Sequence, residues 1–212
     1  DGVDDVVTIV GAGGVTVEGV GGDDTLTGGM GSDTIAGAAG DDVVEGGMGD
    51  DTITGGEGSD TVVFAGNKGD FTFEVAADGT LTVTDLNTMT ALGVDTITGV
   101  ETLSFDDGDL TVTTAEDGYV TLTGTDADDD VTVVGATAVT LQGVMGSDTL
   151  TGGDGADTIV GAEGDDVLEG GMGSDTITGG DGANTVYGGE GDDEILTGKD
   201  ADLIDGGMGS DT

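Results

Sequence analysis

A nine-residue period dominates this sequence and limits what it can fold into. Five consecutive nonapeptides keep one phase from residue 19 to residue 63, and one of them reads GGMGSDTIA at 28–36. Seven more run from 143 to 205, and an incomplete copy, GGMGSDT, occupies 206–212. The shared pattern is G-G-x-G-x-D-x-U-x, where U is a large aliphatic residue. Repetition at a short, fixed period predicts a stack of similar coils.

The residue types within one nonapeptide predict a turn followed by a short strand. Glycine at positions 1, 2 and 4 permits positive φ and close backbone packing. Positions 7–9 alternate around an aliphatic residue, as in a short strand with one buried side chain. Two repeats, or 18 residues, then complete one coil, and coils stack as parallel strands about 4.8 Å apart. The expected inward row contains Leu26, Ile35, Val44, Ile53 and Val62 in the first array, and Leu150, Ile159, Leu168, Ile177, Val186, Ile195 and Ile204 in the second.

The aspartate at position 6 carries the chemistry of the repeat. Because one coil spans two repeats, Asp24, Asp42 and Asp60 are expected to stack along one edge. Carboxylates about 5 Å apart repel by about 3 kcal/mol at an effective dielectric near 20, so a cation is expected between them. Two carboxylates and carbonyls from glycine-rich turns make an all-oxygen cage that suits Ca²⁺ better than Mg²⁺. The predicted metal ligands, together with backbone carbonyls of the adjoining turns, are Asp24, Asp33, Asp42, Asp51, Asp60, Asp148, Asp157, Asp166, Asp175, Asn184, Asp193, Asp202 and Asp211.

This consensus resembles the RTX (repeats-in-toxin) calcium-binding nonapeptide, over about 115 residues. The resemblance implies an all-β fold with two parallel β-rolls, each a right-handed β-solenoid of 18 residues per coil, separated by a short-stranded β capping segment. It also implies that each ion lies between turn n and turn n+2. That pairing predicts about nine Ca²⁺ ions in all. The acidic residues at positions 3 and 5 are expected to face solvent and not to ligate.

A second period of 124 residues divides the chain, because 26 of the 36 residues in 28–63 recur identically in 152–187. The expected parts are 1–63 (starter coils plus the first array), 64–124 (a β capping or connecting segment) and 125–212 (starter coils plus the second array, truncated in mid-repeat). In the starter coils, Val15 and Val139 occupy the position-6 slot. Because the chain starts at Asp1 and not at a methionine, it is expected to be a piece of a longer protein.

The segment 64–124 holds all four phenylalanines, and FTFEV (71–75) and LTVTD (81–85) predict a hairpin. It resembles the segment that closes RTX arrays, although a flexible linker is the alternative. Asp106, Asp107 and Asp109 are interpreted as a solvated turn, with one more ion site as the alternative.

Composition excludes several classes of function. The chain has 46 acidic and two basic residues and a formal charge of −44, which would repel nucleic acid and anionic lipid alike. Without cysteine or histidine it lacks disulfides, Ser-His-Asp and Cys-His nucleophile arrangements and histidine zinc sites. No apolar run approaches the roughly 18 residues of a membrane span, so no membrane insertion is expected. No catalytic motif occurs, and the chain is predicted not to be an enzyme.

The resemblance and the duplication together predict a structural module of a large extracellular or cell-surface bacterial protein: an adhesin, surface layer or fibre. Such a module folds on calcium after secretion, through type I secretion, and has neighbouring copies of itself as candidate partners. The alternative is a C-terminal secretion and folding module of an RTX enzyme or toxin whose catalytic domain lies elsewhere. The weakest coil is expected around Asn184 and 197–202, where Lys199 stands beside the ion row. The methionines at position 3 have no physical explanation at this level.

Overall fold

The computed structural model describes residues 2–89, 91–116 and 118–212, so that Asp1, Thr90 and Asp117 lie outside the description. Two compact units are present, one formed by residues 1–71 and 80–112 and the other by 72–79 and 113–212. The three-part division expected from the sequence stays a prediction. Both units are all-β, as predicted, and the described residues contain 22 strands and a single 3₁₀ turn, η1 (Lys68–Asp70). Within the described ranges, no helix is long and apolar enough to cross a bilayer.

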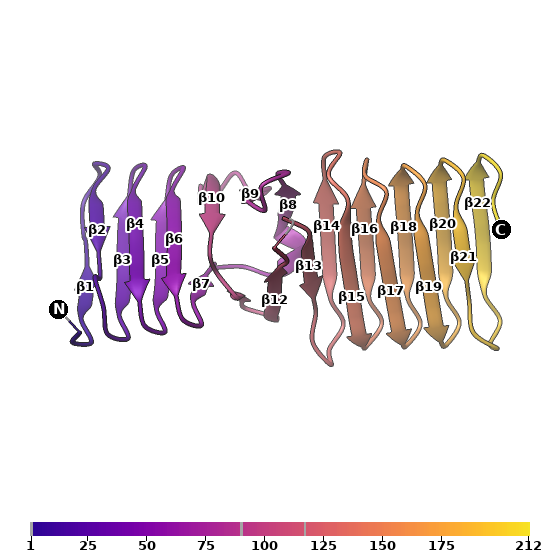
Figure 1. Cartoon of the computed structure of the whole chain (residues 1–212), viewed down its shortest axis with the longest axis horizontal. Helices are drawn as coiled ribbons and strands as arrows, with labels where there is room; N and C mark the ends of the chain where they lie inside the picture. Colours follow the sequence, from indigo (N-terminus) through magenta and orange to yellow (C-terminus); the bar gives the residue numbers. More distant parts are fainter. Residues whose placement is uncertain (1, 90, 117) are drawn as a thin grey trace. The chain divides into compact units, whose positions relative to one another are not determined.

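Unit 1 is a β-roll whose repeat strands are parallel and alternate between two sheets, extended by one antiparallel strand pair in each sheet (Figure 1). One sheet contains β1 (Val6–Thr8), β3 (Thr25–Met30), β5 (Val43–Met48), β7 (Thr61–Val63), β11 (Thr102–Phe105) and β12 (Gly108–Thr114). The other contains β2 (Thr16–Glu18), β4 (Thr34–Ala39), β6 (Thr52–Glu57), β10 (Val94–Thr98) and β9 (Leu81–Asp85). Leu26 pairs with Val44, and Ile35 pairs with Ile53, so one coil takes 18 residues as predicted.

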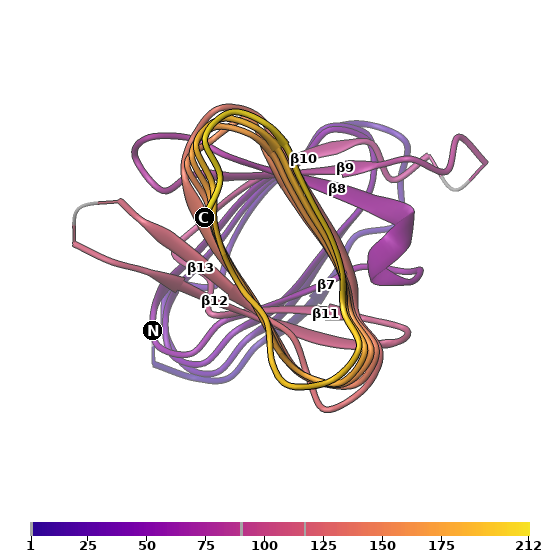
Figure 2. The ribbon, with the colours of Figure 1, turned by 90° about the vertical axis from the view of Figure 1, so that its right-hand side faces the viewer.

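Unit 2 repeats this architecture, and its coils superpose as flattened rings when viewed end-on (Figure 2). One sheet contains β13 (Val120–Thr123), β15 (Val139–Met145), β17 (Thr158–Glu163), β19 (Thr176–Asp181) and β21 (Glu194–Leu196). The other contains β8 (Phe71–Val75), β14 (Asp130–Val134), β16 (Thr149–Gly153), β18 (Val167–Met172), β20 (Thr185–Glu190) and β22 (Leu203–Met208). The described pairs between repeat strands are parallel, with Ile159 opposite Ile177 as an example.

The core of each unit is the predicted row of aliphatic side chains, one from each nonapeptide. From Leu26 to Val62 and from Leu150 to Val186, every member of the row is at most 2% exposed. The row opens at the last coil, where Ile204 is 49% exposed because β22 is an edge strand of its sheet in the described structure. One buried side chain per nine residues gives a thin core, so interactions at the turns must contribute much of the stability.

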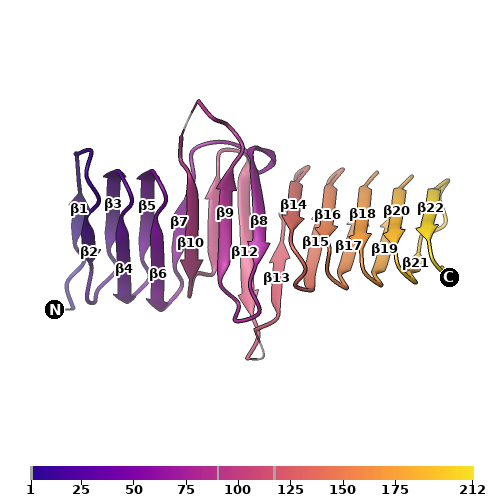
Figure 3. The same ribbon diagram turned by 90° about the horizontal axis from the view of Figure 1, so that it is seen from above.

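Residues 94–105 add a coil to unit 1 that the nonapeptide phase alone does not reveal (Figure 3). Strand β10 pairs in parallel with β6, and β11 pairs in parallel with β7, which places Ile97 and Leu103 in the inward row. The residues DTITG at 95–99 match positions 6–9 and 1 of the repeat. Within the same unit, the rings of Phe64, Phe71 and Phe105 form a cluster with centroids 5.3–5.4 Å apart.

Candidate metal centre

The position-6 aspartates form continuous rows along the edges of both units. In most of them the main-chain N–H donates to Oδ1 of the position-6 residue one coil further on, and for Asp157 and Asp175 the N···O distance is 2.8 Å. The same bond joins Asp24 to Asp42, Asp42 to Asp60, Asp33 to Asp51, Asp148 to Asp166, Asp166 to Asn184, and Asp175 to Asp193. Every predicted ligand up to Asp193 is at most 2% exposed. Asp202 is half-buried and Asp211 is exposed, because both lie in the last coils.

The second carboxylate oxygen of these residues is buried without a hydrogen-bond partner among the described residues. This holds for Oδ2 of Asp24, Asp33, Asp42, Asp51, Asp60, Asp148, Asp157, Asp166, Asp175 and Asp193. A buried ionised oxygen with no partner is strongly unfavourable, so ten of them in register indicate a missing cationic partner. No three acidic side chains in the described ranges come together closely enough to hold a metal by themselves. A cation there must also be bound by the backbone.

The glycine at position 1 supplies that backbone environment. A Cβ atom built on Gly161 would contact Oδ2 of Asp166 and would lie 2.8 Å from the carbonyl oxygen of Gly179. A Cβ on Gly152 would likewise contact Oδ2 of Asp157 and the carbonyl oxygen of Gly170. At eight of the ten orphaned oxygens, all but those of Asp42 and Asp51, the same small space also contains a carbonyl oxygen from the following coil. Carboxylate and carbonyl oxygens are the ligands that Ca²⁺ prefers, so the residues fit this ion.

Positions 2 and 4 need glycine for a different reason, which is backbone conformation. Gly29 and Gly31 have φ of 105° and 104°, in the left-handed region. Val20 and Ala38 occupy position 2 with φ of 82° and 89°, a conformation that side chains with a Cβ adopt at a cost. Position 1 therefore needs glycine for close approach alone, whereas positions 2 and 4 need it for positive φ and also for close approach, as at Gly47 and Gly49.

Burial also changes the ionisation of the rows. Burial, together with the nearby carboxylates of Asp175 and Asp154, raises the pKa of Asp157 to about 7, although the hydrogen bond from the Val139 N–H lowers it. Burial raises the pKa of Asp148 to about 6, with the Asp166 carboxylate as a second cause. Burial likewise raises the pKa values of Asp42, Asp51, Asp60, Asp166 and Asp175 above 3.8. The calcium-free rows thus favour protonation.

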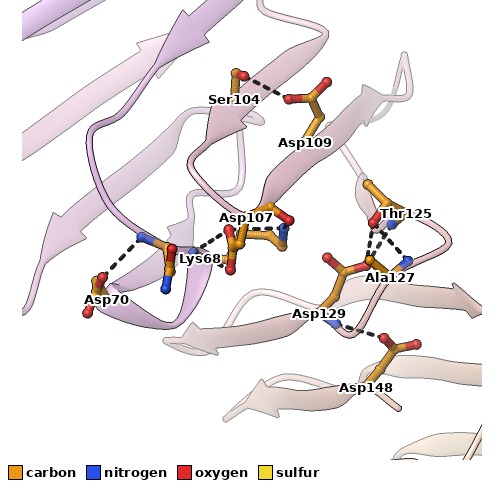
Figure 4. Close-up of polar contacts among 10 residues, drawn as sticks. Lys68, Asp70, Ser104, Asp107, Asp109, Thr125, Ala127, Asp129 and Asp148 are labelled. Carbon is orange, nitrogen blue, oxygen red and sulfur yellow. Dashed lines mark hydrogen bonds and ion pairs between the residues drawn. The ribbon is translucent and has the colours of Figure 1, made fainter. Parts of the chain in front are cut away.

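Sequence reasoning missed four residues that extend the rows. Oδ1 of Asp95 accepts from the N–H of Asp51, and burial raises the pKa of Asp95 to about 7. Oε2 of Glu101 accepts from the N–H of Asp60 at 2.8 Å. Asp129 donates its N–H to Asp148 (Figure 4), and Asp5 donates to Asp24. The motifs DTITG at 95 and DDVT at 129 carried this signal, but the full glycine pattern did not precede them.

A second ladder runs along the position-5 residues in the opposite direction. The N–H of Ser59 donates to Oδ1 of Asp41, which lies one coil earlier, and the N–H of Asp41 donates to Oδ1 of Asp23. In unit 2 the N–H of Ala183 donates to Asp165 in the same way. These carboxylates are exposed, as expected, but they also connect successive coils, which the sequence did not predict.

The acidic turn at 106–109 is bound by protein groups. The Lys68 ammonium lies 3.1 Å from Oδ1 of Asp107 and donates to the carbonyl oxygen of the same residue (Figure 4). Asp109 accepts a 2.7 Å hydrogen bond from the Ser104 hydroxyl. Lys68 is fully buried, so this interaction anchors η1 to the turn. Two of the three carboxylates thus have side-chain partners, which favours the turn over the additional ion site.

The coil around Asn184 differs from the others as the sequence suggested. Oδ1 of Asn184 accepts from the N–H of Asp166, but its amide nitrogen faces the carbonyl oxygen of Gly182 at 3.5 Å. A donor therefore stands where other coils present an unpaired oxygen. In the next coil of that edge, Asp200 accepts from the N–H of Gly182, and Lys199 is exposed.

The stacked coils and buried acidic rows define a parallel β-roll with an oxygen-lined turn in each repeat. The RTX calcium-binding nonapeptide repeat matches the chain at residues 10–44, 27–62, 142–177 and 178–212, which together exceed half of its length. The chain therefore belongs to this family of calcium-binding repeats, as the sequence resemblance predicted.

Among solved structures, the extracellular lipase LipA from Serratia marcescens is similar over 95% of this chain, at 22% identity and a TM-score of 0.34. The chain spans about a third of that lipase, since the match covers 34% of the lipase chain. No curated protein matches the sequence of this chain significantly.

Proposed function

We propose that this chain is a structural module that folds around calcium, with the thirteen predicted position-6 residues as its side-chain ligands. The observation that carries the proposal is the set of ten buried Oδ2 atoms, eight of which lie beside a carbonyl oxygen of the following coil. When bound, Ca²⁺ supplies positive charge and accepts these oxygens as ligands. About nine ions would reduce the formal charge from −44 to about −26, which leaves the loaded chain acidic.

The module serves best as part of an extracellular or cell-surface bacterial protein, exported by type I secretion, in which copies stand in tandem. The near-identity of 28–63 and 152–187 supports this assignment to an adhesin, surface layer or fibre. The competing assignment is a folding module attached to an enzyme or toxin. The two differ in what the full-length protein contains: further copies of the module support the first, and a separate catalytic domain supports the second. We assign no catalytic step to the residues of this chain.

Calcium-dependent folding is tested by circular dichroism at pH 8, above the raised pKa values of the buried aspartates. In chelator the chain should give the spectrum of a disordered polypeptide, and Ca²⁺ should restore the β signal. Mg²⁺ at equal concentration should not, because it retains its waters and requires a tighter octahedron. A β spectrum in chelator contradicts calcium-dependent folding, and equal recovery with Mg²⁺ contradicts the proposed cage.

The position of the ion is tested by a matched pair of glycine substitutions. Gly161→Ala places a methyl group against Oδ2 of Asp166 and the carbonyl of Gly179, so calorimetry should show fewer or weaker calcium sites. Gly13→Ala places its methyl group in open space and should leave calcium binding unchanged. Unchanged binding in Gly161→Ala would show that the ion lies elsewhere.

A further inference from the structure

A groove recurs at the same place in both modules, outside the acidic rows. In unit 1 it lies over β3 and β5, and its lining includes Val10, Gly29, Glu45, Gly47 and Met48. In unit 2 it lies over β16 and β18, and its lining includes Val134, Gly153, Glu169, Gly171 and Met172. Each residue of the first set becomes its counterpart by adding 124 to its number. The volumes are about 280 Å³ and about 440 Å³.

The hollow follows from the backbone of the repeat. The floor consists of position-2 glycines, and Gly29 and Gly47 pair in register with φ of 105° and 106°. Without side chains they leave a depression, and a Cβ on Gly47 would contact the carbonyl oxygen of Gly29. The walls are exposed apolar side chains: Val10 is 92% exposed and Met48 is 45% exposed. Glu45 lines the same groove and is exposed to solvent.

The β-roll itself does not require these wall residues. Position 9 tolerates threonine, alanine, valine, tyrosine, leucine and aspartate in the two arrays, yet glutamate occurs there only at 45 and 169. Between 28–63 and 152–187, three of the four position-3 pairs differ, and the pair that is unchanged is Met48 and Met172. The glutamate and the methionine of the walls are thus retained, whereas other exposed positions, including the lining pair Met30 and Asp154, have diverged.

The chemistry of the groove suits one kind of occupant. Apolar walls beside a glutamate carboxylate accommodate a side chain with an aliphatic stem and a cationic head, as in lysine and arginine. The chain has two basic residues, of which Lys68 is buried against Asp107. A second copy would offer one exposed lysine, Lys199, among 46 acidic residues, and net repulsion opposes that approach. A basic segment of a partner protein is therefore the occupant that the chemistry of the groove fits best.

We propose that each groove docks a lysine or arginine side chain of an extended basic segment of a partner protein. The stem packs on Met48 and Val10, or on Met172 and Val134, and the cationic head pairs with Glu45 or Glu169. The unit 2 groove carries Asp154 where unit 1 has Met30, so it is the more acidic of the two. Binding at unit 2 is accordingly tighter and more sensitive to salt.

The first test uses a fluorescein-labelled pentapeptide that alternates lysine and valine, measured by anisotropy on folded protein with calcium present at about 150 mM salt. The double variant Glu45→Gln, Glu169→Gln should weaken binding by roughly fivefold. The control Glu57→Gln, Glu190→Gln removes the same charge from exposed positions outside the grooves and should change binding by less than about twofold. Equal loss in both variants, or no loss in either, overturns the proposal, since the peptide would then follow the net charge alone.

The second test needs no substitution in the grooves, so it stands even if those variants fold poorly. With ¹³C-methyl methionine, the peptide should shift the resonances of Met48 and Met172. Met145 and Met208 also occupy position 3 but line neither groove, and their resonances should remain in place. Shifts of similar size at all four methionines, or none at Met48 and Met172, would refute docking in the grooves.

Discussion

The main-chain N–H of Asp157 donates to Oδ1 of Asp175 at 2.8 Å, while Oδ2 of Asp175 stays buried without a protein partner in the described structure. One carboxylate therefore has two separate uses. Its first oxygen fixes the register between coils, and its second is available to an ion. An asparagine keeps the Oδ1 acceptor but has an amide nitrogen in place of Oδ2. Asn184 therefore continues the hydrogen-bonded row but lacks the second oxygen that an ion would bind.

Folding of the calcium-free chain should depend on pH. The pKa values of Asp157 and Asp148 are about 7 and about 6 in the fold, against 3.8 for an unperturbed aspartate, so the fold binds more protons than the unfolded chain. This contribution is complete below about pH 4 and is lost as pH rises through 6 to 7. Without calcium, the β signal in circular dichroism should be stronger at pH 5 than at pH 8.

Salt separates this effect from general repulsion between the carboxylates. High salt at pH 8 screens exposed charges but protonates none of the buried groups. If salt alone restores the same β signal as acid, protonation of the rows is not the cause. Calcium added at pH 6 should also release protons, which titration in buffers of different ionisation enthalpy would measure.

The edge containing Asn184 should be the weaker calcium-binding edge of unit 2. Asn184→Asp restores an oxygen and a charge, so calcium affinity at that edge should rise on the order of tenfold, or about 1.4 kcal/mol. Asp175→Asn removes both from the opposite edge and should lower affinity there. Calorimetry measures both calcium affinities. If Asn184→Asp leaves the affinity unchanged while Asp175→Asn lowers it, the asymmetry between the edges is refuted.

The position-5 ladder should contribute to stability without contributing to calcium binding. Asp41→Ala removes the acceptor of the Ser59 N–H and should lower the free energy of unfolding by about 1 kcal/mol. Asp41→Asn keeps an acceptor and should be nearly neutral. Urea unfolding in saturating calcium measures the difference, and equal effects of the two substitutions would assign the loss to charge.

The ion pair between Lys68 and Asp107 should stabilise unit 1 independently of calcium. Lys68→Met removes a buried ammonium that donates to both the carbonyl and Oδ1 of Asp107, and the expected loss is about 2 kcal/mol. Lys199→Met removes the same charge from an exposed turn and should change stability by less than about 0.5 kcal/mol. Urea unfolding at two calcium concentrations should give the same loss for Lys68→Met; a loss that varies with calcium would place Lys68 in the ion rows.

The sequence predicted the coil, the inward row and the acidic row because each depends on one residue type at one position. Leu26 and Asp24, for example, need only the nine-residue phase to be placed. Asp95 was missed because an insertion precedes it. Asp95 therefore follows its hydrogen-bond partner Asp51 by 44 residues, whereas repeat partners are 18 residues apart. The ladder through Asp41 was missed because an exposed aspartate gives no sign in the sequence of which N–H it accepts from.

The constant 18-residue register has a mechanical consequence. Each repeat coil is bonded to the coil before it and the coil after it, so a pulling force would detach one coil at a time at a similar load. A released coil of 18 residues extends to about 60 Å but occupies about 4.8 Å in the stack. A tether built from such coils lengthens in equal steps of roughly 55 Å. Its extension under load is therefore proportional to the number of coils that have opened.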